Sequence, residues 1–238
     1  TRKKATLELG GKAANIVFDD APIDQAVEGI VNGIFFNQGQ VCCAGSRLLV
    51  HEGTAARLIA KLKARMAHIR VGDPLEAGTD IGPVASGAQL ETDLSYIQAG
   101  HDDGGELLAG GGMVEGKTKG HFLAPTLFSA KPDDRIVREE IFGPVAAVLR
   151  ADDYEQALAM ANDTEFGLCA GICTTSLKYA THFKRHAQAG MVMVNLPTAG
   201  VDPHVPFGGR KASSYGPREQ GRYAVEFYTT VKTAYTAA

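Results

Sequence analysis

Short apolar runs alternate along this chain with longer segments whose apolar residues recur at helical spacing. Asn15–Phe18, Leu48–Val50 and Val145–Leu149 are runs typical of buried strands. Ile23–Phe35 instead places its apolar residues on one face of a helix. Strands that alternate with helices form βαβ units, in which helices cover both faces of a parallel sheet. The sequence therefore predicts an α/β fold, with a mostly parallel sheet in a three-layer domain.

The same alternation continues to the end of the chain. We expect further helices over 58–69, 86–97 and 153–161, and further strands over 106–109, 167–175 and 191–194. Asp20 precedes the first helix and is expected to be its N-cap, because Asp accepts hydrogen bonds from the free N–H groups there. From Phe227 to Tyr235 the residues alternate as in an edge strand, which is a ready site for pairing with another subunit. The predicted fold thus ends in a C-terminal oligomerisation strand.

Composition argues against two classes of partner. The 238 residues carry a formal net charge of −3, whereas nucleic-acid binding needs clustered Lys and Arg. No apolar run reaches the roughly 18 residues that a membrane-spanning helix needs, so no membrane partner is expected. The sequence starts within a strand-like segment around Leu7, and we therefore expect an N-terminal part to be missing.

The four cysteines fall as one vicinal pair, Cys42 and Cys43, and one looser pair, Cys169 and Cys173. Vicinal cysteines bridge poorly, because disulfide geometry strains the peptide between them. The looser pair has no second ligand pair nearby in the sequence, so no metal site is expected, and both thiols are interpreted as small buried apolar groups. Free thiols favour a reducing compartment, and so a cytoplasmic protein.

Two residues are candidates for chemistry on local grounds. Cys42 is flanked by small residues that let the backbone approach the sulfur and offer N–H donors, although a buried structural cysteine is an equally ordinary interpretation. Glu8 lies in an apolar strand that ends at Gly10 and Gly11, where desolvation would raise the pKa of its carboxyl and suit a general base. Glu8 could equally be a strand residue held in a salt bridge.

Taken together, these motifs resemble the aldehyde dehydrogenase superfamily. Glu-Leu-Gly-Gly-Lys at 8–12 is followed by Phe-Phe-Asn-Gln-Gly-Gln at 35–40, and Cys42 stands 34 positions after Glu8. Further matches in the same order are Glu139–Pro144, Asn162–Leu168 and Pro206–Lys211. The resemblance covers essentially the whole chain.

The resemblance implies a division of the chain. Enzymes of the family are about twice as long, and their N-terminal half carries most of the dinucleotide-binding domain, whereas this chain has no Gly-x-Gly-x-x-Gly fingerprint. Residues 1–8 are then the end of a missing cofactor-binding domain and 9–222 the catalytic domain. Residues 223–238 form a C-terminal oligomerisation extension, and a homo-oligomer, dimer or tetramer, is expected.

The resemblance also implies a reaction. The Cys42 thiolate attacks an aldehyde substrate to give a thiohemiacetal, and hydride passes to NAD or NADP to leave a thioester. Glu8 then deprotonates the water that hydrolyses the thioester. An oxyanion would be held by the Cys42 backbone N–H and by an Asn side chain from the missing half.

Further site residues are implied in the same way. Glu140 would accept hydrogen bonds from a ribose hydroxyl, Phe142 would pack near the nicotinamide ring, and Gln89 is a weaker ribose candidate. The residues expected to line the aldehyde tunnel are Phe36, Val201, His204 and Phe207. Without the resemblance, Glu140 would be interpreted as part of a solvated acidic run, the Phe142 and Phe207 rings as core, and Gln89 as helix surface.

One branch of the family is favoured by two segments. Asn195–Asp202 and Ser213–Gly221 look most like the dehydrogenases of 2-oxoglutarate semialdehyde (2,5-dioxopentanoate), and the second segment departs from the more usual Ser-Gly-x-Gly. Such a substrate carries a carboxylate, which His204 or Arg210 could meet as a cation. Either residue could also be part of the surface.

Three other interpretations stay open. A cofactor-free cysteine hydrolase would need a histidine beside Cys42, and no spacing nominates one of the seven histidines. An enzyme that transfers the acyl group to coenzyme A would generally lack the base at Glu8. Finally, the chain could be an inactive fragment that lacks the cofactor domain and only folds and self-associates.

Overall fold

A seven-stranded sheet forms the centre of the computed structural model, which describes residues 3–116, 118–200 and 202–238. Its strands are, in chain order, β2 (Ala14–Val17), β3 (Arg47–His51), β4 (Glu106–Ala109), β5 (Thr126–Ser129), β6 (Val145–Ala151), β8 (Cys169–Cys173) and β9 (Met191–Val194). Their order across the sheet is β4-β5-β6-β3-β2-β8-β9, and only the pair β4 and β5 is antiparallel. The prediction of a mostly parallel sheet is confirmed.

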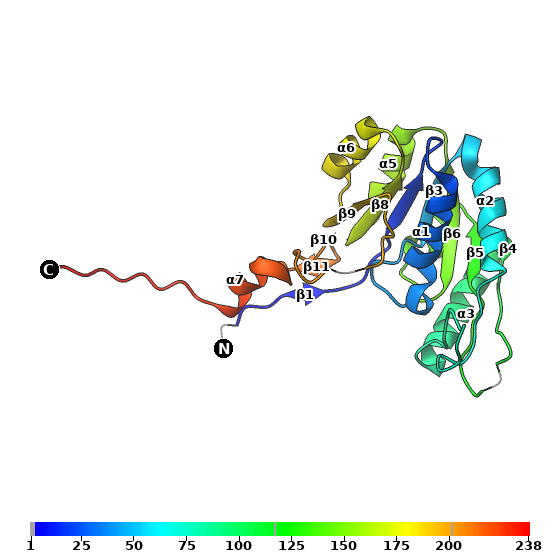
Figure 1. Ribbon diagram of the computed structural model, residues 1–238, viewed down its shortest axis with the longest axis horizontal. Helices are drawn as coiled ribbons and strands as arrows, with labels where there is room; N and C mark the ends of the chain where they lie inside the picture. The colour runs from blue at the N-terminus through cyan, green and yellow to red at the C-terminus, as the bar shows by residue number, and fades with distance from the viewer. Residues whose placement is uncertain (1–2, 117, 201) are drawn as a thin grey trace.

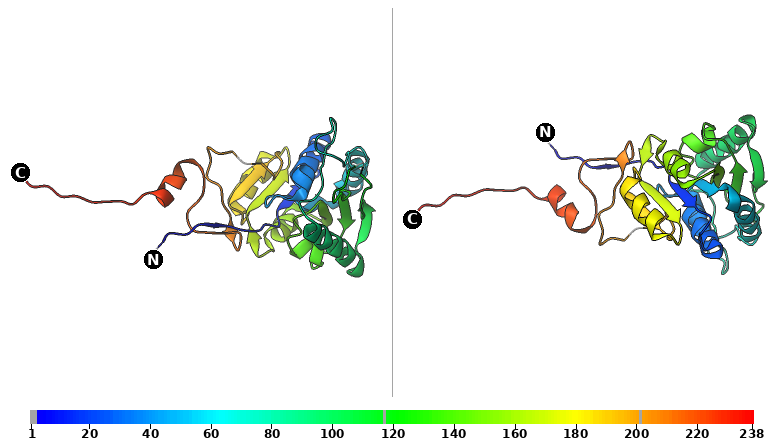
Figure 2. Two further views of the ribbon diagram at one scale, coloured as in Figure 1. Left: turned by 90° about the horizontal axis from the view of Figure 1, so that it is seen from below. Right: turned by 90° about the horizontal axis from the view of Figure 1, so that it is seen from above.

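Helices cover both faces of this sheet (Figures 1 and 2). One face packs against α1 (Ile23–Phe35) and α2 (Glu52–Met66). The other face packs against α3 (Gly87–Asp102), α4 (Arg135–Arg138), α5 (Tyr154–Asn162) and α6 (Leu177–His186). No helix in the described part of the chain is both long and apolar enough to cross a bilayer.

The central strands show why their sequences are apolar without alternation. Ile16 packs with the α3–α6 layer, whereas its neighbour Val17 packs with α1 and α2. Leu48 and Leu49 divide between the two faces in the same way, and all four side chains are at most 1% exposed. Because successive side chains of a strand point to opposite faces, a strand covered on both faces must be apolar throughout.

Four short strands and two helical turns lie beside the main sheet. β1 (Leu7–Glu8) pairs antiparallel with β11 (Ser214–Tyr215), and β7 (Phe166–Gly167) pairs antiparallel with β10 (Arg210–Lys211). The 3-10 turns are η1 (Phe36–Gly39) and η2 (Gly221–Tyr223). The β1–β11 pair brings the first and last parts of the chain together.

The segments that carry the family motifs meet where parallel strands begin. Gly10 and Gly11 precede β2, Cys42 precedes β3 and Gly143 precedes β6. Strands that run in parallel begin at the same edge of the sheet, so these segments are neighbours at its amino edge. Helix α1 runs back toward that edge and ends there, just before Cys42.

The predicted N-cap at Asp20 is wrong. Helix α1 begins after Pro22, which stands at the N-cap and offers no side-chain hydrogen bond. The carboxylate of Asp20 instead accepts hydrogen bonds from the hydroxyl of Thr174 at 2.7 Å and from the backbone N–H of Thr175 at 3.0 Å. Asp20 therefore joins the loop after β2 to the loop after β8.

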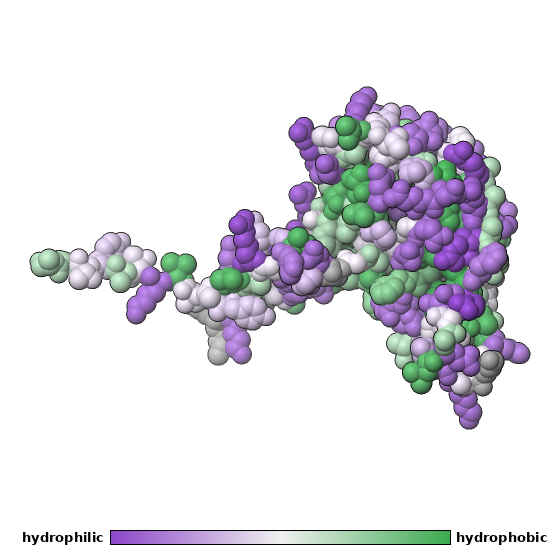
Figure 3. All heavy atoms as spheres, viewed as in Figure 1, coloured by the Kyte–Doolittle hydropathy of each residue, from purple (hydrophilic) through white to green (hydrophobic). Residues whose placement is uncertain are grey.

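The predicted strand over 227–235 is also absent from the single chain. Residues Ala224–Tyr228 form helix α7, and the described residues after it form no strand. The tail extends away from the domain (Figures 1 and 3), with Val231 98% exposed and Tyr235 95% exposed. A terminal strand needs a neighbour to pair its N–H and C=O groups, and no strand among the described residues pairs with the tail.

Candidate active site

The turn that carries Cys42 is shaped by unusual backbone conformations. Asn37 and Gln38, in η1, are left-handed, with φ of 51° and 58°. Gly39 follows with φ of 72°, and a Cβ at this residue would overlap the carbonyl oxygen of Gly143. Glycine satisfies both the conformation and the close approach. The turn therefore packs closely against the segment 139–144, to which the resemblance assigns contacts with the cofactor.

Cys42 is half-buried and carries a free thiol. It packs against a cluster that contains Cys43 and Phe207. The pKa of Cys42 is raised far above its ordinary value. The largest cause is a hydrogen bond with the Cys43 thiol, and the second is burial. The thiol is therefore protonated in this chain, and nucleophilic attack needs a general base or a nearby positive charge.

The other three cysteines are buried and free. Cys169 and Cys173 both lie in β8, at 4% and 6% exposure, which confirms their interpretation as small apolar core residues. Cys43 is 1% exposed, so Cys42 is the thiol of the vicinal pair that has access to solvent.

Glu8 is positioned by the pairing of β1 with β11. The hydroxyl of Ser214, its partner across the two strands, donates to Glu8 Oε2 at 2.8 Å. Burial raises the pKa of the Glu8 carboxyl, and the charge of Glu219 acts in the same direction, whereas the Ser214 hydrogen bond and Arg218 act against it. A carboxyl with a raised pKa, held in one orientation, is suited to general-base catalysis.

The carboxylate and the thiol occupy the same region. Glu8 Oε1 lies beside Gly208, 2.8 Å from where a Cβ on that glycine would be. Phe207, the preceding residue, belongs to the cluster against which Cys42 packs. In addition, the Glu8 charge contributes to a raised pKa of Cys43, which adjoins Cys42. Glu8 and Cys42 thus both lie beside the segment that contains Phe207 and Gly208.

Glu140 lies next to the Cys42 turn, at the mouth of a small hollow. Its Oε1 accepts a hydrogen bond from the backbone N–H of Gly11 at 3.0 Å, and Oε2 accepts none from the described residues. Burial raises the pKa of the Glu140 carboxyl. The hollow is also lined by Phe142, which is 39% exposed and has φ of 60°. An acceptor oxygen without a partner beside an exposed ring suits a ribose next to a flat heterocycle.

Gln89 holds the segment that carries Glu140 and Phe142 through hydrogen bonds. Its side-chain amide donates to Asp93 Oδ1 at 2.8 Å and to the carbonyl of Ile141 at 3.1 Å. Asp93 is fully buried, and a Cβ at Gly143 would overlap its carboxylate. Both donor hydrogens of Gln89 are therefore engaged in holding the segment. No pattern in the sequence marks Asp93, whose importance comes from packing.

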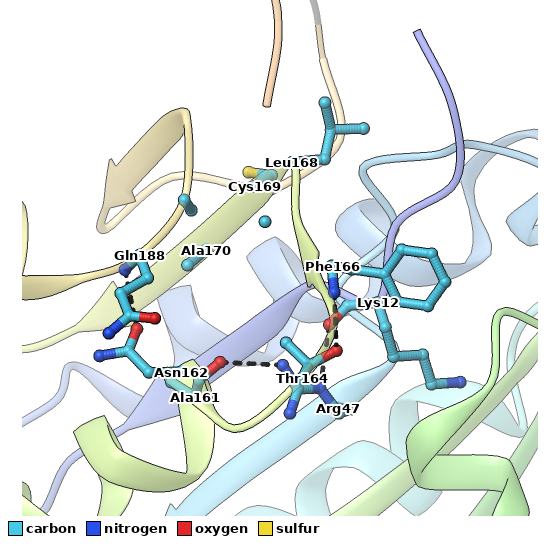
Figure 4. A pocket seen from close by; sticks show the side chains of 12 residues that line it. Lys12, Arg47, Ala161, Asn162, Thr164, Phe166, Leu168, Cys169, Ala170 and Gln188 are labelled. Atoms are coloured by element: carbon cyan, nitrogen blue, oxygen red, sulfur yellow. Dashed lines mark hydrogen bonds between the residues drawn. The ribbon is translucent and has the colours of Figure 1, made fainter. Parts of the chain in front are cut away.

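Lys12 is a second charged residue that is buried near the site. It is 2% exposed, its Nζ has no hydrogen-bond partner among the described residues, and burial lowers the pKa of Lys12 to about 7. Its carbonyl accepts from Arg47, whose guanidinium also donates to the carbonyls of Met160 and Ala161. Figure 4 shows the Lys12 side chain extending away from Arg47.

Replacing Lys12 with methionine is expected to stabilise the fold at and below neutral pH, by on the order of 1–3 kcal/mol, because an unpaired buried charge is removed at nearly constant volume. The folded chain releases the Lys12 proton near pH 7 and the unfolded chain near 10.5. Between these values the unfolded state binds more protons, so stability rises with pH. Lys12→Met should flatten that rise in thermal unfolding curves. An equal dependence of stability on pH in the original protein and in Lys12→Met would contradict the prediction that Lys12 is buried without a partner.

An apolar groove of about 430 Å³ has Phe207 among its lining residues. It is lined by β9 and by the loop that follows it, and Figure 3 shows hydrophobic residues gathered over β9. Of the predicted tunnel residues, Phe207 lines the groove. Phe36, 66% exposed, and His204, also exposed, do not line it, and Val201 lies outside the described residues.

The chain matches the model of the aldehyde dehydrogenase family over residues 1–234. The chain belongs to this family. It is 44% identical over 236 residues to the betaine aldehyde dehydrogenase of Brucella anthropi, a match that covers 98% of this chain and 48% of the relative. The chain thus spans about half the length of the curated relatives that it matches.

Solved structures of the family have the same fold. PnpE from Pseudomonas sp. WBC-3 superposes with a TM-score of 0.91 at 44% identity, covering 94% of this chain and 46% of PnpE. The NAD-dependent aldehyde dehydrogenase from Sinorhizobium meliloti gives a TM-score of 0.90 at 43% identity, covering 94% of this chain and 44% of that protein. A structure of PnpE in complex with nicotinamide adenine dinucleotide also matches, with a TM-score of 0.90.

Proposed function

We propose that the chain carries the thiol and the base of a hydrolytic, NAD-dependent aldehyde dehydrogenase. The observation that supports this most strongly is Glu8: a partly buried carboxylate with a raised pKa, held by Ser214 in the region of the only solvent-accessible thiol among the four cysteines. A base at this position favours water as the acyl acceptor rather than coenzyme A. A catalytic histidine, which a cofactor-free hydrolase would need, has no support from the site.

In the proposed reaction the Cys42 sulfur bonds to the aldehyde carbon, and its proton leaves to solvent through a base. A bound NAD⁺ would supply the acceptor for the hydride that leaves that carbon. Cys42 then holds the acyl group as a thioester, and Glu8 takes a proton from the water that cleaves it. Glu140 Oε2 is available to bind a ribose hydroxyl, and Phe142 to pack beside the nicotinamide ring.

The test is to trap the covalent species. The natural protein that contains this chain is mixed with NAD⁺ and an aldehyde, quenched with acid and examined by peptide mass spectrometry. We expect the added mass of the acyl group on Cys42 and on no other cysteine. An acyl group on another residue, or none in a protein that reduces NAD⁺, would reject the assignment.

For the substrate we propose 2-oxoglutarate semialdehyde, on the resemblance of the loop over 195–202 and of the segment over 213–221. His204, which follows this loop, and Arg210 are exposed basic side chains that we propose to meet the carboxylate. Betaine aldehyde, which carries a positive charge, is the second candidate. It is favoured by the names of the curated relatives and by Asp202, a carboxylate that lines the groove.

The two candidates have opposite charge, so steady-state kinetics separates them. If His204 or Arg210 meets the substrate carboxylate as proposed, we expect kcat/KM for 2-oxoglutarate semialdehyde to exceed that for betaine aldehyde by at least about tenfold, because a basic side chain attracts the anionic substrate and repels the cationic one. Succinate semialdehyde, which keeps the carboxylate, is the control for charge, and a simple aliphatic aldehyde is the control for chain length. A preference for betaine aldehyde would overturn this substrate.

The assembly is proposed to be a homo-oligomer formed through residues 223–238, with residues 9–222 as the catalytic domain and 1–8 as the end of the cofactor-binding domain. The exposed apolar side chains of the tail support this, since Val231 and Tyr235 are almost fully exposed in the single chain. The four free thiols favour a reducing compartment, and we therefore place the protein in the cytoplasm.

A further inference from the structure

One residue of the loop that lines the groove turns inward. Leu196, Pro197, Ala199 and Gly200 line the groove, whereas Thr198 is 0% exposed. Its carbonyl oxygen lies 3.5 Å from the Cys169 sulfur, which donates to it. Thr198 therefore fixes the loop to the interior of the domain.

The Thr198 side chain occupies a socket made of glycines from two elements and a loop, namely α1, β8 and the loop before β3. A Cβ on Gly33, in α1, would lie 3.2 Å from both the backbone nitrogen and Oγ1 of Thr198. A Cβ on Gly45, three positions after Cys42, would lie 2.7 Å from Oγ1. A Cβ on Gly171, in β8, would lie 3.0 Å from Cγ2.

Space, rather than backbone conformation, makes these positions suit glycine. None of Gly33, Gly45 and Gly171 has a φ in the left-handed region. Gly29, one turn earlier in α1, has no atom within 4 Å of an added Cβ. The absence of side chains at the three positions therefore has one shared effect, which is to admit Thr198.

The contribution of Thr198 is its shape. Its Oγ1 is buried and has no hydrogen-bond partner among the described residues, so the hydroxyl adds no directional contact. Both branches of the side chain face the socket, since a Cβ added to Gly45 would lie 2.7 Å from Oγ1 and one added to Gly171 would lie 3.0 Å from Cγ2. A branched side chain in a tight socket holds the backbone that carries it in one position.

We propose that Thr198 is a positioning residue that sets the distance between the groove loop and the Cys42 turn, and so determines the size of aldehyde that reaches the sulfur. Gly45 belongs to the turn of the nucleophile, and the residues on either side of Thr198 form the groove wall. A shift at the contact between Thr198 and Gly45 therefore moves the groove wall relative to the Cys42 turn. The inference rests on the proposed function for its link to aldehydes.

The first test is kinetic. Thr198→Ala empties the socket, whereas Thr198→Val keeps a branched side chain of similar size. In the natural protein, we expect Thr198→Ala to change the ratio of kcat/KM for a bulky and a small aldehyde by about tenfold, with KM for NAD⁺ unchanged within about twofold. Thr198→Val should change the ratio by less than about twofold. Equal effects of both variants would overturn the role of shape.

The second test adds a methyl group on the Gly45 side of the contact and removes side-chain volume on the Thr198 side. Gly45→Ala adds a methyl group where Thr198 lies and should also change the ratio. The double variant Gly45→Ala with Thr198→Ala places that methyl group in the vacated space and should restore the ratio to near its original value. Gly29→Ala, on the open face of α1, is the matched control and should leave the ratio unchanged. A double variant that is worse than either single one would reject the socket.

A third measurement does not depend on the proposed function. In the 238-residue chain, alkylation of Cys42 by iodoacetamide and by the bulkier N-phenylmaleimide is followed by peptide mass spectrometry. We expect Thr198→Ala to change the ratio of the two rates at least about fivefold, and Thr198→Val to leave it unchanged. If the ratio responds but no aldehyde is oxidised, the proposed function fails while the positioning role stands. An unresponsive ratio in a folded variant overturns the inference.

Discussion

Replacing Cys42 with alanine is expected to abolish aldehyde oxidation in the natural protein, with a fall in kcat of at least about 10⁴-fold. The loss is large because the sulfur forms the covalent bond on which hydride transfer and hydrolysis both depend. NAD⁺ reduction in the presence of aldehyde measures the effect.

The matched control is Cys173→Ala, which makes the same chemical change at a buried cysteine of β8 that packs with α1 and α2. It should lower stability but leave kcat within about twofold, since core truncations act mainly on folding. Substantial oxidation by Cys42→Ala, or a complete loss in a well-folded Cys173→Ala, would place the reacting sulfur elsewhere.

The second large effect is expected for Glu8→Gln. The amide keeps the shape of the carboxylate and can still contact Ser214, but it cannot take a proton from water. We expect hydride transfer to proceed once and thioester hydrolysis to slow by about 10²–10⁴-fold, the usual contribution of a general base. Rapid mixing should then show a burst of NADH equal to the enzyme concentration, and the acyl group should accumulate on Cys42.

The pH dependence supplies a further check on Glu8. Burial raises the pKa of its carboxyl in the folded protein, so hydrolysis should increase as pH rises through that raised value and level off above it. Ser214→Ala removes a hydrogen bond that lowers the pKa of Glu8, and should move the increase to higher pH. Glu8 would be excluded as the base if Ser214→Ala left the pH dependence of hydrolysis unchanged, or if Glu8→Gln turned over at the normal rate.

The sequence predicted the sheet well because its information there is local. Ile16, Val17, Leu48 and Leu49 form apolar runs that only a doubly covered sheet can bury, and the helices between them carry apolar stripes. Asp20 was misjudged because its partners, Thr174 and Thr175, are separated from it by more than 150 residues. A local N-cap pattern carries no information about such a partner.

Packing explains what the sequence missed in the site. Asp93 and Thr198 act by filling space beside glycines, and no spacing along the chain marks a glycine whose Cβ would overlap a distant residue. Ser214 reaches Glu8 only through the pairing of two short strands from opposite ends of the chain. The family motifs predict Cys42 and Glu8 as site residues, but the residues that support them emerge only from the tertiary structure.

The half-buried position of Cys42 beside Cys43 has a consequence for how the thiol is protected. The contact with Cys43 and burial both disfavour the thiolate, and the charge of Glu140 acts in the same direction. Without a positive charge beside it, the sulfur therefore reacts slowly with oxidants and electrophiles, and on the proposed function a bound cationic nicotinamide ring would raise its reactivity.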